Sequence, residues 1–154
     1  GQINIVYNHK PSLFFHPHID GDKSPLYSFG YGLSYTTFKY SDLKVSKTEY
    51  TKDEEITVTF NVTNTGNMQG EEVAQLYIRD DYSQSTRPVK ELKRFERISL
   101  EKGETKKVTF TLNKDDLSCY NYRAEYVLEA GSFTVMVGGS SLDKDLLKVK
   151  FNIK

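Results

Sequence analysis

The chain has 154 residues, which is enough for one domain with a sizeable hydrophobic core. Its 21 basic and 21 acidic side chains cancel, so no long-range field draws it to nucleic acid or to an anionic membrane. No apolar run approaches the ~20 residues that span a bilayer, and the single cysteine, Cys119, cannot form an internal disulfide. We therefore expect neither nucleic acid nor membrane as a partner.

The first 37 residues differ in character from the rest. Residues 1–7 hold a short apolar run that could form one strand, and residues 8–32 are dense in Pro, Gly, His and aromatic side chains. This composition is typical of an ordered connecting segment, but it carries too many rings for a solvated linker. We expect the rings to pack across the domain or on a neighbouring domain. A ligand-binding aromatic platform is the alternative.

From Phe38 onward, short segments alternate apolar and polar residues, which is the period of half-buried strands. In residues 55–62, for example, Ile56, Val58 and Phe60 share one face. About eight strands at this spacing predict an all-β, two-sheet antiparallel sandwich preceded by an irregular linker. The predicted strands are 38–46, 55–62, 72–79, 91–100, 105–112, 120–128, 132–137 and 146–153. The strands 55–62 and 72–79 are separated by a turn at residues 64–67, and we expect them to pair as neighbours.

Four sequence motifs, together with the first residues, resemble the last domain of glycoside hydrolase family 3. SPLYSFGYGLSYTTF at residues 24–38 is similar to the family segment that leads into this domain, and VTNTG (62–66), RPVKELK (87–93) and GSFTVMVG (131–138) follow in the family's order. GQINIVYNHKP (1–11) resembles the end of the preceding α/β sandwich domain. The resemblance implies an immunoglobulin or fibronectin type III-like sandwich at 38–154, an aromatic-rich linker strap at 12–37 and a remnant of the preceding domain at 1–11.

The resemblance also implies what the chain does. The family that the chain resembles includes β-glucosidases and β-xylosidases. These enzymes are retaining glycosidases, and their two catalytic carboxylates lie on the two domains that precede this one. This chain would therefore be a non-catalytic, C-terminal part of a periplasmic or secreted enzyme that acts on β-glucosides or similar plant-type oligosaccharides. Its partners would be the catalytic domains of the same polypeptide, with an oligosaccharide at the domain edge as a further possibility. We assign no catalytic residue and no cofactor.

Two segments are candidates for docking against those domains. One is the strap around Tyr27–Tyr35, and the other is the connection 80–90, which is longer than a hairpin loop needs to be. The expected docking residues are four aromatic anchors and two interface charges: Tyr27, Phe29, Tyr31, Tyr35, Arg87 and Lys90. The alternative for the connection 80–90 is a mobile loop tip.

Other groups invite a chemical interpretation that we reject. His16 and His18, with Asp20 and Asp22, could bind a metal, but the intervening proline and the lack of further ligands favour a solvated or docking linker. Ser41-Asp42 lacks the aromatic residue that follows the family's nucleophile. The carboxylate pairs 54–55, 71–72 and 115–116 are expected to be solvated charges.

A carbohydrate-binding module is the rival class for a β-sandwich from a sugar-active enzyme. The chain has no tryptophan, the residue that sugar-stacking platforms favour, but its 11 tyrosines could substitute. A protein-interaction or spacer module is the third class. The segment 121–126 departs from the family pattern, so we expect this hairpin to have its own shape.

Overall fold

The computed structural model describes residues 6–9 and 25–154. In these parts the secondary structure is almost wholly strands. The elements are β1 (Phe38–Val45), β2 (Glu49–Tyr50), β3 (Ile56–Asn64), β4 (Gly70–Asp80), β5 (Glu91–Leu100), β6 (Thr105–Leu112), α1 (Lys114–Leu117), β7 (Cys119–Tyr120), β8 (Tyr126–Val127), β9 (Gly131–Gly138), the 3-10 turn η1 (Asp143–Asp145) and β10 (Leu147–Ile153).

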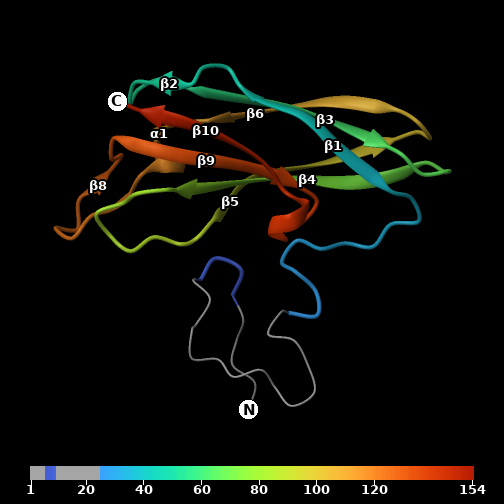
Figure 1. Ribbon diagram of the computed structural model, residues 1–154, viewed down its shortest axis with the longest axis horizontal. Coiled ribbons are helices and arrows are strands. Elements are labelled where there is room, and N and C mark those ends of the chain that lie inside the picture. Colours follow the sequence, from blue (N-terminus) through green and yellow to red (C-terminus); the bar gives the residue numbers. More distant parts are fainter. Residues whose placement is uncertain (1–5, 10–24) are drawn as a thin grey trace, which may run out of the picture.

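The strands form two main sheets that stack face to face (Figure 1). One sheet has the order β1-β3-β6, and the other has the order β2-β10-β9-β4-β5. Pairing is antiparallel except between β10 and the short β2. A separate two-stranded hairpin joins β7 to β8. The predicted all-β antiparallel sandwich is confirmed.

Strand β3 shows why these residues form a sandwich. Its apolar side chains at alternate positions, Ile56, Val58, Phe60 and Val62, are all buried, and the Thr and Asn residues between them lie on the opposite face. The β6 strand pairs along it and adds Val108 to the same core. Alternation with period 2 therefore places one face of this sheet in the core and leaves the other polar.

The expected pairing of the strands 55–62 and 72–79 is wrong. The strands β3 and β4 belong to different sheets, and residues 65–69 carry the chain across from one sheet to the other. Phe60 and Leu76 lie in the same core cluster, so these strands face each other through their side chains instead of sharing backbone hydrogen bonds. The expected strand 120–128 is also wrong, because only β7 and β8 are extended there.

A fully buried asparagine at the end of β3 organises this crossing. The Asn64 Oδ1 atom accepts hydrogen bonds from the Thr36 hydroxyl (2.7 Å) and the Gly66 amide (3.1 Å). Its Nδ2 atom donates to the carbonyls of Met68 (2.8 Å) and Leu100 (3.1 Å). One amide thus joins the segment before β1, the crossing loop and the end of β5, and every bond satisfies a group near or inside the core.

We expect Asn64→Ala to lower the free energy of unfolding by about 2–4 kcal/mol, because it leaves several buried polar groups without a partner. Denaturant unfolding of the purified chain measures this. Asn61→Ala is the matched control on the same strand, since the Asn61 side chain donates a single hydrogen bond to Asp42 at the surface. Equal losses in the two variants would contradict the role given to Asn64.

Candidate functional site

The strand β4, in the five-stranded sheet, is buried on both of its faces over part of its length. On β4, residues 74–78 are all buried. Leu76 and Ile78 point into the sandwich core, whereas Tyr77 belongs to a second cluster on the outer face with Met136 and Leu146. Because a strand whose two faces are both buried needs a cover on each side, something must shield the outer face from water.

Residues from the start of the chain provide that cover. The Tyr7 ring packs edge-on against Tyr77 with 6.0 Å between centroids, and its hydroxyl accepts a hydrogen bond from the Leu92 amide at 3.2 Å. The Phe29 ring stacks on Tyr7 at 4.2 Å. In Figure 1, residues 6–9 lie beneath the five-stranded sheet, on the side away from β3. Phe29 thus packs on another early residue, and its role as an anchor for a neighbouring domain stays a prediction.

The strap, which comprises residues 25–37 in the structure, is also held by hydrogen bonds. The Gln75 side chain is only 3 % exposed. Its Nε2 atom donates to the Gly30 carbonyl (3.0 Å) and the Gly139 carbonyl (2.7 Å), and its Oε1 atom accepts from the Tyr77 hydroxyl. In addition, the Ser141 amide donates to the Phe29 carbonyl at 2.8 Å. The strap is therefore fixed at two consecutive residues, Phe29 to the loop after β9 and Gly30 to the Gln75 side chain on β4.

Gly30 allows this close approach, whereas Gly32 does not contribute to it. Gly30 has a φ of +77°, and a Cβ atom there would lie 2.0 Å from the Gln75 Oε1 atom. Gly32 has no heavy atom within 4 Å of its Cβ position. A side chain at residue 30 would therefore displace either the strap or the Gln75 amide.

We expect Gly30→Ala to destabilise the chain by about 1–3 kcal/mol, from the left-handed backbone and the displaced hydrogen bonds. Gly32→Ala, two residues away, should change stability by less than about 0.5 kcal/mol. Hydrogen exchange at the Ser141 amide gives a local measure, and it should accelerate only in Gly30→Ala. Similar exchange rates in the two variants would contradict the anchoring of the strap at this point.

The strap presents large apolar side chains to solvent although its backbone is anchored. Tyr35 is 98 % exposed and Leu33 86 % exposed. Tyr27 and Tyr31 are also exposed and stack on each other with 5.4 Å between centroids, while Phe29 is half-exposed at the edge of the anchored part. An open groove of about 1040 Å³ lies beside the strap and is lined by residues from β1, β4 and β5.

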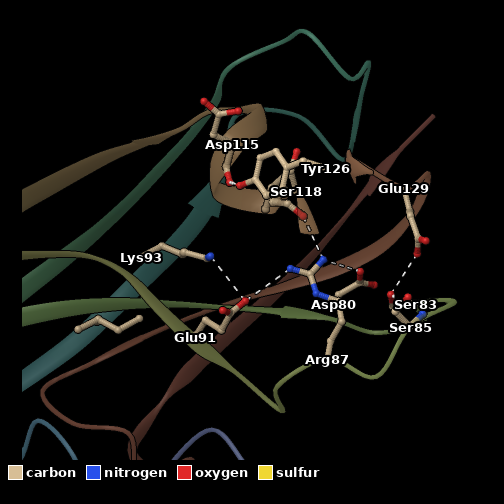
Figure 2. Close-up of polar contacts among 12 residues, drawn as sticks. Asp80, Ser83, Ser85, Arg87, Glu91, Lys93, Asp115, Ser118, Tyr126 and Glu129 are labelled. Carbon is tan, nitrogen blue, oxygen red and sulfur yellow. Dashed lines mark hydrogen bonds and ion pairs between the residues drawn. The ribbon is translucent and has the colours of Figure 1, made fainter. Parts of the chain in front are cut away.

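Arg87 lies inside the domain, not on its surface (Figure 2). Its side chain is 9 % exposed. The Nη1 atom donates to Asp80 Oδ2 and to the Leu117 carbonyl, each at 3.0 Å, and Nη2 lies 3.5 Å from Glu91 Oε2. The guanidinium group thus joins the ends of β4 and β5 to α1. Sequence reasoning placed this charge at an interface and missed that acidic residues at both strand ends would surround it.

Lys90 is equally enclosed. Its side chain is 7 % exposed. The ammonium group donates to the Ser141 carbonyl (2.6 Å) and to Asp143 (3.0 Å). Because the Ser141 amide donates to the Phe29 carbonyl, Lys90 helps to position the residue that binds the strap. In the structure both charged groups bind residues of the same domain. A direct contact of Arg87 or Lys90 with another domain stays a prediction.

The connection between β4 and β5 is tied down along its length. The Ser83 hydroxyl donates to Glu129 at 3.1 Å (Figure 2). The Gln84 amide donates to the same carboxylate, also at 3.1 Å. Asp81 accepts hydrogen bonds from the Thr134 hydroxyl at 3.0 and 3.1 Å. Desolvation opposes ionisation of Asp81, but hydrogen bonds from Lys150, Thr134 and Ser132 outweigh it and lower the pKa of the carboxyl group. These contacts do not fit a free loop tip.

The expectation that the acidic pairs are solvated is wrong at two positions. Asp116 caps the start of α1 and binds Arg94 through two 2.6 Å hydrogen bonds. Glu72 is half-buried beside the groove, where the Tyr40 hydroxyl donates to it at 2.7 Å and no ion pair is found among the described residues. Burial raises the pKa of the Glu72 carboxyl, and the hydrogen bond from Tyr40 opposes the shift only in part.

A raised pKa in the folded state has a definite consequence for stability. Below the ordinary pKa of 4.5, Glu72 is protonated in both the folded and the unfolded state. As the pH rises above 4.5, the unfolded state loses this proton more readily than the folded state, so the free energy of unfolding falls. We therefore expect Glu72→Gln to melt at a higher temperature than the parent chain at neutral pH, with a difference that shrinks toward pH 4. Melting curves between pH 3.5 and 7.5 test this. Glu71→Gln is the control, because that exposed carboxylate pairs with Arg97.

The remaining candidate groups are Asp42 and the cluster around His16 and His18. Asp42 lies in a β-bulge of β1 with φ of 56° and accepts a hydrogen bond from Asn61. His16, His18 and the neighbouring acidic residues lie outside the described residues. Within residues 6–9 and 25–154, no group of three or more His, Cys, Asp or Glu side chains is arranged to hold a metal ion. No helix in the same residues has the length and apolar character needed to cross a membrane.

Comparison with known proteins identifies the domain type. The model of the fibronectin type III-like domain matches residues 72–141. A putative β-xylosidase of Formosa agariphila is 46 % identical over 154 residues, which cover 100 % of this chain and 20 % of that protein. A periplasmic β-glucosidase of Salmonella typhimurium is 40 % identical over 92 % of this chain and 20 % of its own length. The solved structure of a β-glucosidase from Erythrobacter marinus superposes with a TM-score of 0.87 at 33 % identity, over 96 % of this chain and 19 % of that one.

The fold and these matches define the chain as a fibronectin type III-like β-sandwich domain. It belongs with the C-terminal domains of family 3 glycoside hydrolases, as the motifs at residues 24–38, 62–66, 87–93 and 131–138 indicate. The chain spans about one fifth of the length of the relatives that it matches.

Proposed function

We propose that this chain is the non-catalytic C-terminal module of a longer β-glycosidase and that it docks on the catalytic domains through the strap. The observation that carries the proposal is the combination of an anchored backbone with exposed apolar side chains. Phe29 and Gly30 are bonded to the sheet, while Leu33 and Tyr35 extend into solvent a few residues later. Aromatic and aliphatic groups held in this way are typical of the buried part of an interface.

The position of the strap in the chain supports the same partner. Residues 6–9 lie under the five-stranded sheet and precede the strap, so whatever comes before them in a longer polypeptide starts next to this surface. The relatives carry about four fifths of their length outside the matched part. A neighbouring domain tethered at this point has a high effective concentration for the strap and the groove beside it.

Arg87 and Lys90 take an indirect part in this proposal. Lys90 holds Ser141, which in turn binds the Phe29 carbonyl, and Arg87 fixes the loop in which Lys90 lies. These two charges position the docking surface, and the exposed aromatic residues make the contact. Truncating Arg87 would disturb the isolated sandwich, because the buried Asp80 would lose its counter-charge.

The parent enzyme would hydrolyse β-xylosides, β-glucosides or similar oligosaccharides, by the retaining mechanism of two carboxylates about 5–5.5 Å apart. Both carboxylates would lie in the preceding domains, and no residue of this chain takes part in the reaction. The periplasmic relative supports an exported parent. The isolated chain should therefore release no product from an aryl β-xyloside or β-glucoside.

The test uses the longer polypeptide that contains this chain. Leu33→Ala and Tyr35→Ala should each lower its melting temperature by roughly 2–5 °C and reduce turnover of an aryl β-xyloside or β-glucoside, because each removes a buried interface contact. The same variants of the 154-residue chain should melt as the unaltered chain does, since both side chains are exposed there.

Tyr120→Ala serves as the matched control, because Tyr120 is an exposed tyrosine on the β7–β8 hairpin, away from the strap. It should leave the melting temperature of the longer polypeptide unchanged. The docking proposal fails if the two strap variants leave both stability and turnover at the level of the unaltered polypeptide.

A further inference from the structure

The β7–β8 hairpin, residues 119–127, carries three exposed tyrosines that the proposed docking role does not use. Tyr120 is 68 % exposed, Tyr122 73 % and Tyr126 51 %. Tyr120 and Tyr126 are cross-strand partners, with ring centroids 5.1 Å apart. Figure 1 shows this hairpin projecting from one end of the sandwich, whereas the strap joins β1 at the other end.

The tip of the hairpin has a fixed shape. The Asn121 amide donates to the Glu125 carbonyl and the Ala124 amide donates to the Asn121 carbonyl, each at 3.0 Å. The Asn121 side chain accepts from the amides of Arg123 (2.9 Å) and Glu125 (3.0 Å). Ala124 adopts φ of 60°, a left-handed conformation that costs a non-glycine residue about 1 kcal/mol. A strained and densely bonded turn at the surface indicates that its geometry is used.

The base of the hairpin is held by the sandwich. The Tyr126 hydroxyl donates to the Asp115 carbonyl at 2.9 Å (Figure 2). The Arg87 guanidinium donates to the Leu117 carbonyl. Leu117 and Leu128, at the two ends, are buried in the main core. The tyrosine rings therefore stand on a preorganised support, which lowers the entropy cost of binding to them.

We propose that this hairpin is a binding platform for a β-linked glycan chain, whose sugar rings stack on Tyr120 and Tyr122. Tyrosine joins an apolar ring face, which suits the C–H face of a pyranose, to a hydroxyl that bonds to water or to sugar hydroxyls. Arg123 and Glu125 place charged groups at the tip, whereas the Asn121 side chain is bonded within the turn. The Arg123 guanidinium lies 5.2 Å from the Tyr122 ring centroid and covers one face of that ring.

The dimensions of the hairpin favour a glycan over a protein. A stable protein interface buries about 800 Å² on each partner and involves roughly 20–30 residues a side, whereas this hairpin comprises only residues 119–127, with two residues in each strand. A single glycan chain is thin enough to be held by two rings and a few hydroxyl contacts. The choice of a β-linked glycan rests on the proposed function, since the relatives are named β-xylosidase and β-glucosidase.

The experiment measures binding of the 154-residue chain to soluble xylan and to soluble mixed-linkage β-glucan by affinity electrophoresis. Retardation by at least one of these polysaccharides is expected. Tyr120→Ala and Tyr122→Ala should each weaken binding at least tenfold, whereas Tyr120→Phe keeps the ring and should stay within about threefold of the unaltered chain. Tyr35→Ala, a matched exposed tyrosine on the strap, should bind as the unaltered chain does.

Four results of the binding experiment would overturn the proposal. They are absence of binding to both polysaccharides, unchanged binding by Tyr120→Ala and Tyr122→Ala, loss of binding in Tyr120→Phe, and equal binding to soluble starch, whose linkages are α. Unaltered melting temperatures of the variants show that any loss is local. If Tyr120→Ala instead destabilises the longer polypeptide, the hairpin is an interdomain contact and the glycan platform is wrong. The strap variants test docking separately, so the two proposals can fail independently.

Discussion

The burial of β4 on both faces is the constraint on which the rest of the structure depends. Residues 74–78 have no exposed position, so this part of β4, together with Met136 and Leu146, needs a second layer of side chains outside the sandwich. The chain supplies it with Tyr7 and Phe29, which precede the sandwich in sequence. The strap is therefore part of the fold, and the direction from which the preceding chain reaches the domain follows from it.

The two outer faces of the sandwich consequently differ. On the three-stranded sheet, the outward positions of β3 are Thr57, Thr59 and Asn61, next to Thr109 and Thr111 on β6. Such a face is compatible with water and needs no partner. On the five-stranded sheet, the outer face holds Tyr77 and is covered by segments with exposed apolar groups of their own. A contact with another domain is thus favoured on the side of the strap.

Much of the fold could be predicted from sequence, because alternation in residues such as Ile56, Val58 and Phe60 determines which way each side chain points. The same alternation does not indicate which strands pair in a sheet, and this explains why the predicted pairing of β3 with β4 is wrong. A strand directs its side chains in the same way whether its neighbour in sequence lies beside it or across the core. The cover of Tyr77 by Tyr7 was equally hidden, since no local pattern links residues so far apart.

The candidate site was predictable only in part, for a physical reason. The strap rings were identified because exposed aromatic residues are unfavourable in a linker. Arg87 and Lys90 were expected at an interface because residues 87–93 resemble a family motif whose segment faces the other domains. Their partners, Asp80 and Asp143, lie at strand ends and in turns, and only the folded structure brings them together.

The enclosed charges also explain how one domain could serve two partners at opposite ends. Replacing a buried ion pair by apolar residues often costs little, whereas removing one member alone costs about 3–5 kcal/mol, so such pairs specify an arrangement more than they stabilise it. Arg87 and Lys90 lie three residues apart in one loop. Arg87 reaches Leu117 at the base of the hairpin, and Lys90 reaches Ser141 beneath the strap. The loop between β4 and β5 therefore fixes the β7–β8 hairpin relative to the strap. A glycan bound to the hairpin would be held in a constant position relative to a domain docked on the strap.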